Sequence, residues 1–574
     1  MPLADTHLLL RAFVDELVRC GIRAAVTSPG SRSAPLVLAL AREPGLRSHS
    51  LIDERCAGFF ALGLAKAGGV PVAMACTSGT AAANYGPAVH EAREARVPLL
   101  VLTADRPPEL REVGAGQAID QLGLFGSAAK WFFDVGTHEA TPGRVRWIRQ
   151  LACRAFWTAS QGRPGPVHLN FALREPLVPE GELPAEPGGG GRAGGRPWVT
   201  RPSSPAPPAV LEGLAAEMRA RPRGLVVAGR EERDPGLGEV LARFAEAAGY
   251  TLLAEPTSGA RRGSAAVAHY DALLRDPAWA TAHEPQLVLR VGDLPTSKPL
   301  REWLAGLPET TLQVAFDPEG AWQDPAAAVA TSLPLVAGPA LAGAAPSAPG
   351  EPAWLERWKR ADRAAAQAIA TALADGMGEP RVAAELGVRL PAAATLVVAS
   401  SMPIRDVETF WPVRPDPPRV LANRGANGID GTVSTALGVA AAGPGPVILL
   451  IGDVALAHDA GGLIAARRLG LALTIVVTNN GGGGIFEFLP VAEARDVFEE
   501  HVATPTGIDV STLAALAGAE HELVTEPEAL RAGLDRGLAG DGVTVLEVRT
   551  DRRENVELHR RVWAAVAEAV ARVS

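Results

Sequence analysis

The sequence has little cysteine, no excess of positive charge and no apolar run of membrane-spanning length. Its four cysteines are scattered and form no CxxC pair, which excludes a zinc ribbon or a disulfide framework and favours a reducing compartment. The 64 acidic residues outnumber the 55 basic ones, so a basic nucleic-acid-binding surface is not expected as the main activity. Apolar runs such as 97–104 and 446–453 are too short to cross a bilayer and suit buried strands of a parallel sheet.

Two further absences narrow the location and the chemistry. The first 21 residues lack the basic and long apolar regions of a signal peptide, so we expect a cytoplasmic protein without an integral membrane segment. No GxSxG motif is present, and His90, His168 and His458 do not form a Ser/His/Asp order with a nucleophile elbow. The hydrophobic share of 47% and the charged share of 21% instead predict a globular chain with a large core.

The order of predicted elements indicates an α/β protein of several domains. A chain of 574 residues is long enough for about three to five domains. Repeated strand–helix–strand units predict parallel sheets covered on both faces, and two Gly/Pro-rich stretches, 181–208 and 336–352, predict linkers. We therefore expect three doubly wound parallel-sheet domains, at 1–180, 209–335 and 353–574. The expected strands lie near 22–28, 70–76, 97–103, 224–229, 250–254, 286–291, 311–316, 395–399, 446–451, 473–478 and 544–548. The expected helices include 5–20, 34–42, 54–67, 80–95 and 454–469.

The strongest local signal for chemistry lies in residues 451–486. One apolar strand ends at Gly452-Asp453, and the next ends at Asn479-Asn480, which four glycines follow. A single βαβ crossover can place Asp453 and Asn480 at the carboxyl ends of neighbouring strands, where open α/β sheets bind ligands. Carboxylate, amide and carbonyl oxygens suit Mg²⁺, and the glycines would let a diphosphate approach the backbone closely. The alternative is a strand-end turn with a capping Asp and a glycine-rich loop.

This spacing resembles the metal and cofactor motif of the thiamine diphosphate enzymes. In that superfamily the Asp, the second Asn and a backbone carbonyl two residues later hold the metal, which implies Asp453, Asn480 and Gly482 here. The chain departs from the motif at Val454, where Gly is frequent, and at Gly461, where Asn is frequent. The resemblance implies thiamine diphosphate and Mg²⁺ as cofactors, with Mn²⁺ as a possible substitute.

A second part of the site is expected near Glu54. This residue lies where a strand end in LIDERCAGFF meets an apolar helix, so its side chain can project into a pocket. The alternative is an acidic residue stabilised by the helix dipole. The superfamily resemblance implies that Glu54 contacts the aminopyrimidine N1′ and so activates the cofactor as the catalytic carboxylate. It also implies active sites shared between subunits of a homodimer or homotetramer.

A set of longer motifs narrows the resemblance to one family. SPGSRS (28–33), TADRPPEL (103–110), SSMPIRD (400–406) and NRGANGIDG (423–431) together resemble the 2-succinyl-5-enolpyruvyl-6-hydroxy-3-cyclohexene-1-carboxylate (SEPHCHC) synthases, the MenD family. The reaction implied is decarboxylation of 2-oxoglutarate and conjugate addition of the succinyl carbanion equivalent to isochorismate, in menaquinone biosynthesis. Both substrates carry two carboxylates, which bidentate arginines match.

The resemblance also assigns binding residues. Those implied for the substrates are Ser31, Arg32, Arg106, Gln117, Lys298, Ser401, Arg405 and Arg424. Those implied for the cofactor, besides Glu54 and the metal ligands, are Thr77, Ser78, Gly79, Ile429, Gly452, Gly483, Ile485 and Phe486. Pro299 follows Lys298 where some relatives have a second basic residue, so the expected contribution of the middle domain depends on Lys298.

Two other functions remain open from the sequence. The first is another thiamine diphosphate-dependent 2-oxo acid decarboxylase or carboligase, similar to acetolactate synthase, against which the set of arginines argues. The second is a catalytically silent scaffold with the same fold, against which the joint presence of Glu54, Asp453 and Asn480 argues.

Overall fold

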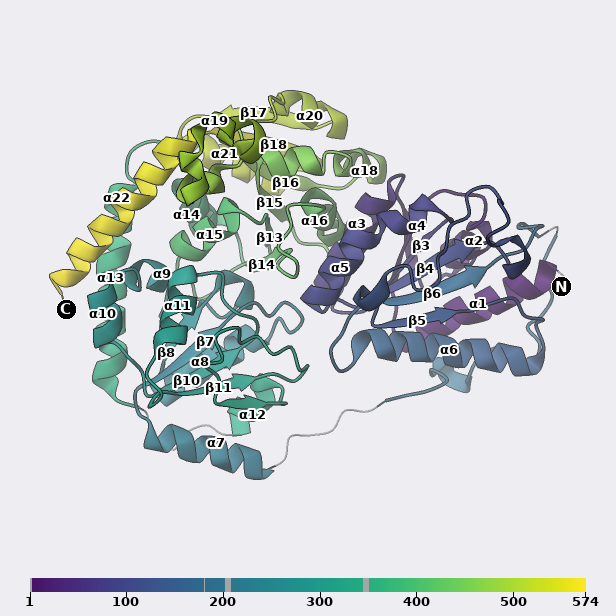
Figure 1. Ribbon diagram of the computed structural model, residues 1–574, viewed down its shortest axis with the longest axis horizontal. Helices are drawn as coiled ribbons and strands as arrows, with labels where there is room; N and C mark the ends of the chain where they lie inside the picture. The colour runs from purple at the N-terminus through teal and green to yellow at the C-terminus, as the bar shows by residue number, and fades with distance from the viewer. Residues whose placement is uncertain (1–2, 180, 202–207, 344–349, 574) are drawn as a thin grey trace. The chain divides into compact units, whose positions relative to one another are not determined.

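The described residues form three parallel sheets of six strands each. The computed structural model describes residues 3–179, 181–201, 208–343 and 350–573 (Figure 1). The described chain forms two compact units, one made of 1–203, 423–444 and 458–471, and the other of 204–422, 445–457 and 472–574. Among the described residues, no helix is both long and apolar enough to span a bilayer.

The first unit holds one sheet with the strand order β2-β1-β3-β4-β6-β5. Its strands are β1 (Ala24–Thr27), β2 (Arg47–Ser50), β3 (Val72–Cys76), β4 (Leu99–Asp105), β5 (Trp131–Asp134) and β6 (Val167–Ala172). Its helices are α1 (Leu3–Cys20), α2 (Ala34–Arg42), α3 (Glu54–Gly68), α4 (Thr80–Asn84), α5 (Gly86–Ala95), α6 (Pro142–Ser160), α16 (Thr432–Ala442) and α18 (Gly462–Leu469). Every residue of β3 and β4 is buried, as expected for parallel strands that are covered on both faces.

Helices α3 and α16 pack at very short range within this unit. A Cβ atom at Gly63 would lie 2.1 Å from the Thr435 carbonyl oxygen, and one at Gly438 would lie 2.2 Å from the Phe60 carbonyl oxygen. Only glycine at both positions allows the two backbones to approach this closely. The later segment of the chain is thereby fixed against the helix that begins at Glu54.

The second unit contains the other two sheets. The middle sheet has the order β9-β8-β7-β10-β11-β12, which is that of a dinucleotide-binding fold, whereas the last sheet, β14-β13-β15-β16-β18-β17, repeats the order of the first. The strands are β7 (Gly224–Ala228), β8 (Thr251–Ala254), β9 (Ala266–Val267), β10 (Leu287–Val291), β11 (Leu312–Phe316), β12 (Thr331–Leu333), β13 (Thr395–Val398), β14 (Arg419–Ala422), β15 (Val447–Gly452), β16 (Leu473–Asn479), β17 (Glu520–Val524) and β18 (Val543–Arg549). The helices are α7 (Pro208–Ala220), α8 (Leu237–Ala248), α9 (Tyr270–Leu273), α10 (Pro277–Ala282), α11 (Lys298–Gly306), α12 (Ala337–Gly343), α13 (Pro352–Ala372), α14 (Glu379–Arg389), α15 (Met402–Phe410), α17 (Asp453–His458), α19 (Arg495–Phe498), α20 (Val510–Ala517), α21 (Pro527–Ala539) and α22 (Arg552–Ala571).

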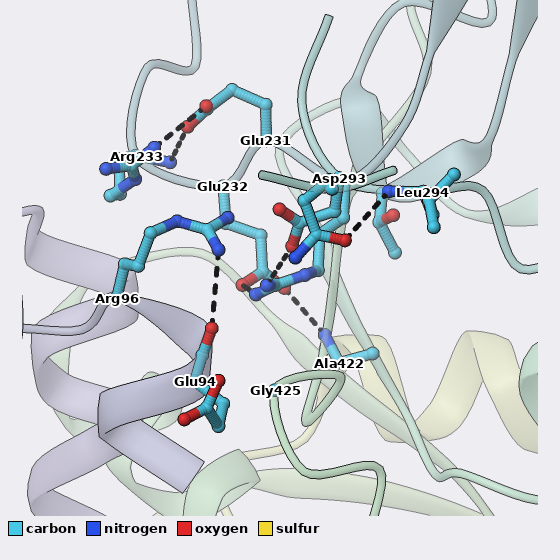
Figure 2. A network of polar contacts seen from close by, with 12 residues as sticks. Glu94, Arg96, Glu231, Glu232, Arg233, Asp293, Leu294, Ala422 and Gly425 are labelled. Carbon is cyan, nitrogen blue, oxygen red and sulfur yellow. Dashed lines mark hydrogen bonds and ion pairs between the residues drawn. The ribbon is translucent and has the colours of Figure 1, made fainter. Parts of the chain in front are cut away.

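One apolar core and one polar network join the two sheets of this unit. Trp354 and Trp358 of α13 are buried in a core that draws on both sheets. At the carboxyl end of β7, Glu232 accepts a 2.9 Å hydrogen bond from the Ala422 N–H at the end of β14 (Figure 2). Arg230 forms ion pairs with Glu232, at 3.2 Å, and with Asp293.

Most predicted elements are present, but three predictions need correction. The helix expected at 454–469 is two helices, α17 and α18, since Gly461 and Gly462 are poor helix formers, and the buried Asp459 between the two helices accepts hydrogen bonds from Ser434 of α16. The helix expected at 80–95 is divided at Tyr85 into α4 and α5.

The third correction concerns the predicted linkers. Part of the segment 336–352 is the helix α12, whose Ala340 and Leu341 are buried in the core around the middle sheet. Residues 344–349 of that segment, and 202–207 of the segment 181–208, lie outside the described residues. Within 181–201 the chain packs on the first unit, where Glu186 forms a 2.9 Å ion pair with the buried Arg149.

Candidate active site

The predicted metal ligands lie at the carboxyl ends of two adjacent strands. Strands β15 and β16 pair in parallel, with Gly452 opposite Thr478, so Asp453 and Asn480 follow neighbouring strand ends as predicted. Asp453 Oδ2 and Asn480 Oδ1 are buried and have no hydrogen-bond partner among the described residues. Two oxygens of this kind are costly unless a ligand satisfies them. Both are hard oxygens, which fits a Mg²⁺ ion.

The glycine-rich loop after β16 has a backbone that few other residues could adopt. Gly481 and Gly482 have φ values of 71° and 142°, and a Cβ atom at Gly482 would lie 2.7 Å from the Ala503 carbonyl oxygen. The Gly484 N–H donates a 2.9 Å hydrogen bond to the Gly482 carbonyl, which leaves that oxygen a second lone pair for a metal. A Cβ atom at Gly484 would lie 2.5 Å from Asn480 Nδ2, so the loop also makes room for the Asn480 amide.

Electrostatics at this loop favour a bound cation. Burial raises the pKa of Asp453 to about 6. Backbone N–H groups, including that of Gly482, and the charge of the Arg552 guanidinium oppose the rise only in part. A divalent cation beside the carboxylate would stabilise its charged form and so remove this penalty.

The Asn480 side chain is held in place by Glu379, a residue that was not predicted from the sequence. Its Nδ2 donates a 2.8 Å hydrogen bond to Oε1 of Glu379, the first residue of α14. The same oxygen accepts a 3.1 Å hydrogen bond from the Thr550 hydroxyl. Burial, followed by the charge of Asp406, raises the pKa of Glu379, and Asp406 itself pairs with His559 at 2.8 Å.

Glu54 begins α3 in the first unit without serving as its cap. The neighbouring Asp53 is the N-cap and accepts hydrogen bonds from the N–H groups of Arg55, at 2.8 Å, and Cys56, at 3.3 Å. Partial burial raises the pKa of the Glu54 side chain, and a hydrogen bond from its own backbone N–H opposes the rise in part. Burial is the main cause that raises the pKa of the Cys76 thiol at the end of β3, and the charge of Glu54 is the second. The Glu54 carboxylate therefore lies near that strand end.

The predicted residues Thr77, Ser78 and Gly79 form the buried loop after β3. The Gly79 N–H donates a 2.9 Å hydrogen bond to Oε1 of Gln121, and Gln121 Nε2 donates to the Ala104 carbonyl, at 3.1 Å, and to Asn170 Oδ1, at 3.0 Å. Gln121 is 1% exposed, so this side chain ties the loop to β4 and β6. Gln121 was not among the predicted residues, although it follows closely on the predicted Gln117.

Several of the predicted substrate-binding residues of the first unit meet at this loop. Arg106 donates hydrogen bonds to Ser78 Oγ and the Gly116 carbonyl, and Gln117 Nε2 donates to the Ser78 carbonyl at 3.0 Å. Desolvation is the main cause that lowers the pKa of Arg106, and the charge of Arg32 is the second. The two guanidinium groups therefore lie near each other. Arg32 is buried and donates 2.9 Å hydrogen bonds to Glu175 and to the Leu173 carbonyl. The exposed Ser31 directly precedes it.

Arg424 and Ile429 lie in another loop of the first unit. The Glu91 carboxylate of α5 accepts hydrogen bonds from the Gly425 N–H, at 2.9 Å, and the Ala426 N–H, at 2.6 Å, which holds the backbone beside Arg424. The Ile429 carbonyl accepts a 3.0 Å hydrogen bond from the Thr432 hydroxyl at the start of α16.

The remaining predicted residues lie in the second unit. Ser401 has a φ of 75° and precedes α15, where Arg405 donates a hydrogen bond to the Ser401 carbonyl. Desolvation, and next the charge of Arg301 on α11, lower the pKa of Arg405. Lys298 begins α11, is largely exposed and lies 3.4 Å from Glu302. Ile485 and Phe486 belong to the short 3-10 helix η5 (Gly484–Phe488), which follows Gly483.

The predicted residues thus form two groups, one in each unit. The first unit contains Ser31, Arg32, Glu54, Thr77, Ser78, Gly79, Arg106, Gln117, Arg424 and Ile429. The second contains Lys298, Ser401, Arg405, Gly452, Asp453, Asn480, Gly482, Gly483, Ile485 and Phe486.

Comparison with known proteins assigns the family. Three family models match: the N-terminal TPP binding domain of thiamine pyrophosphate enzymes at residues 9–124, the middle domain of thiamine pyrophosphate at 194–398, and the C-terminal TPP binding domain at 403–548. SEPHCHC synthases from Geobacillus kaustophilus and Myxococcus xanthus are each 44% identical to the chain, over 98% of both sequences. The chain belongs to the SEPHCHC synthase family. A further member, from Chloroflexus aurantiacus, is 43% identical over 99% of this chain and 97% of its own.

The fold of this SEPHCHC synthase family member is shared more widely among thiamine diphosphate enzymes. Benzoylformate decarboxylase from Polynucleobacter necessarius superposes with a TM-score of 0.72, covering 95% of this chain and 98% of its own, at 17% identity. The prediction of three doubly wound parallel-sheet domains is confirmed, and the cofactor implied by both binding domains is thiamine diphosphate.

Proposed function

We propose that the chain catalyses the SEPHCHC synthase reaction of menaquinone biosynthesis. It would decarboxylate 2-oxoglutarate, release CO₂ and add the remaining succinyl unit to isochorismate. The observation that carries this proposal is the 44% identity, over nearly the whole chain, to relatives named for that activity. The cluster of Arg32, Arg106 and Ser78 supports it, because both substrates are dicarboxylates.

The residues present fit the cofactor and a divalent metal. Asp453, Asn480 and the Gly482 carbonyl would hold Mg²⁺, or Mn²⁺ in its place, and the two unpartnered oxygens support this assignment. Gly452 and Gly483 would contact the diphosphate, while Ile429, Ile485 and Phe486 would line the cofactor site. When bound, thiamine diphosphate would supply the electron sink that decarboxylation of a 2-oxo acid requires.

Glu54 is the proposed catalytic carboxylate. It would hold a proton between its carboxylate and the pyrimidine N1′, beside the loop of Thr77, Ser78 and Gly79. Its raised pKa supports this role, because a carboxyl group that shares a proton with a weakly basic ring nitrogen must not be strongly acidic. A Glu54→Gln variant keeps the size and polarity of the side chain. It should bind cofactor with ordinary affinity and show almost no turnover.

The remaining polar residues would bind the substrate carboxylates. Arg32, Arg106, Arg405, Arg424 and Lys298 supply the positive charge. Ser31, Ser401 and Gln117 supply neutral hydrogen-bonding groups. Fixed cations of this number suit a pair of dianionic substrates better than a small monoanionic acceptor.

We also propose the assembly, the location and the domain boundaries given by the sequence. Active sites shared between subunits of a homodimer or homotetramer follow from the resemblance to the superfamily. The four free thiols support a cytoplasmic location. The boundaries 1–180, 209–335 and 353–574 are supported by the position of one sheet in each.

The decisive experiment is an isochorismate consumption assay with purified protein, thiamine diphosphate, Mg²⁺ and 2-oxoglutarate. Loss of isochorismate that depends on 2-oxoglutarate would support the proposal, and persistence of isochorismate beside an active control enzyme would refute it. Turnover of pyruvate alone would favour an acetolactate synthase-like carboligase. Failure to bind thiamine diphosphate with Mg²⁺ in calorimetry would favour a silent scaffold.

A further inference from the structure

The amide of Asn480 can serve a metal in only one of its two orientations. Its oxygen must face the cation, and its NH₂ group must face away. The two ends have nearly the same shape, so packing alone discriminates weakly between them, and hydrogen bonding has to decide. In the part of the chain that the structure describes, the buried amide oxygen has no partner, and the NH₂ group donates to Glu379.

The surroundings of Glu379 make it a selective partner for the NH₂ end. Oε1 of Glu379 is the acceptor in this 2.8 Å contact, so it attracts the NH₂ group and repels the amide oxygen. The Thr550 hydroxyl also donates to Oε1 of Glu379, at 3.1 Å, which fixes that oxygen from a second side. Glu379 is 2% exposed, so water does not compete for its oxygens.

We propose that Glu379 is a positioning residue of the metal site, which orients the Asn480 amide so that Oδ1 faces the cation. The inference rests on the proposed function, since it takes Asn480 as a metal ligand. Glu379 itself does not contact the metal or the substrates in this proposal. It acts as the outer partner of a ligand, a class of residue whose loss typically weakens metal binding by about 10–100-fold.

A pair of substitutions separates this role from a general structural one. In Glu379→Gln the new amide can offer either its oxygen or its NH₂ group, so Asn480 loses its preference and Mg²⁺ affinity should fall by about 10–100-fold. In Asn480→Asp two carboxylates would meet across the present 2.8 Å contact, which should weaken Mg²⁺ binding through repulsion. In the double variant the introduced glutamine amide can donate to one oxygen of the introduced aspartate and leave the other oxygen for the metal. The affinity of the double variant should therefore exceed that of either single variant.

The readout is the dissociation constant of Mg²⁺, measured by calorimetry on the full chain at saturating thiamine diphosphate, so that it does not depend on turnover. Glu385→Gln is the matched control. Glu385 is on the same helix, pairs with Arg381 and Arg531, and should leave Mg²⁺ affinity unchanged. The melting temperature of the metal-free protein shows whether a variant is folded.

Two results would overturn the positioning role. One is Mg²⁺ affinity in Glu379→Gln equal to that of the unaltered chain. The other is a double variant that binds Mg²⁺ no more tightly than Asn480→Asp alone, a comparison that still decides if Glu379→Gln alone does not fold. Failure of the unaltered chain to bind Mg²⁺ would instead refute the proposed metal site, and so the two failures are distinguishable.

Discussion

Replacing Gln121 with Met should destabilise the first unit far more than its single side chain suggests. The change keeps the approximate length of the side chain but removes three hydrogen bonds, to Gly79, Ala104 and Asn170. The Gly79 N–H would be left buried without a partner, at a cost of about 1–3 kcal/mol, and each of the other two lost bonds costs about 0.5–1.5 kcal/mol. Together these give a loss of about 2–6 kcal/mol in the free energy of unfolding.

The measurement is urea unfolding followed by circular dichroism, with the transition midpoint and slope compared between variants. Gln117→Met is the matched control, because Gln117 is exposed and loses only one side-chain hydrogen bond, to the Ser78 carbonyl, so the free energy of unfolding should fall by about 0.5–1.5 kcal/mol. The Gln121→Met variant should also bind thiamine diphosphate more weakly, since the loop of Thr77, Ser78 and Gly79 loses its anchor. A Gln121→Met protein as stable as the Gln117→Met control would refute the reasoning.

The remaining predictions concern the buried Asp459 and the contact between α3 and α16. Burial raises the pKa of Asp459 from 3.8 to about 6, so its contribution to stability is full below pH 3.8 and is lost as the pH rises through 6. Asp459→Asn removes this titration. As the pH rises from 4 to 7, the free energy of unfolding of the variant should increase by up to about 3 kcal/mol relative to that of the unaltered chain, as measured by thermal unfolding. A difference that does not change with pH would contradict this. Gly438→Ala places a methyl group 2.2 Å from the Phe60 carbonyl oxygen and should cost at least about 1–3 kcal/mol in chemical denaturation. Gly213→Ala, in open space on α7, should instead stabilise the chain by up to about 1 kcal/mol, and equal effects of the two substitutions would refute the steric argument.

The sequence was sufficient to predict many of the strands, and that Asp453 and Asn480 follow neighbouring strand ends, for a simple physical reason. Strands of a covered parallel sheet are short continuous apolar runs, and the polar residue that ends each run marks the edge where ligands bind. Asp453 and Asn480 are such residues on adjacent strands, and the pairing of β15 with β16 confirms their placement. The predicted role of each residue at the metal stays a prediction.

Elements with polar residues in the core were not predicted. Strand β6 carries the buried His168 and Asn170, which interrupt its apolar pattern; the Thr103 hydroxyl of β4 lies 2.8 Å from His168 Nε2 and donates a 2.8 Å hydrogen bond to Asn170 Oδ1. The edge strand β2 has the sequence RSHS, which has no apolar residue at all. A local hydrophobicity pattern depends only on the residues of one segment. These strands depend instead on contacts with residues of another segment of the chain.

The supporting residues of the site were missed for the same reason. Glu379 lies 101 residues before Asn480, and Gln121 lies 42 residues after Gly79. Neither has a local signal, because a Glu at a helix start and a Gln in a loop are common. Only the folded chain shows that each is buried against a residue of the proposed site.

The contact between α3 and α16 has a consequence for how the chain folds during its synthesis on the ribosome. About 360 residues separate the end of α3 from the start of α16. At a translation rate of roughly 5–20 residues per second, the apolar face of α3 stays uncovered for about 20–70 s before α16 is synthesised. During that interval the nascent chain exposes the apolar face of α3 beside Glu54. We therefore expect chaperones to bind the N-terminal sheet and its helices until α16 has been synthesised.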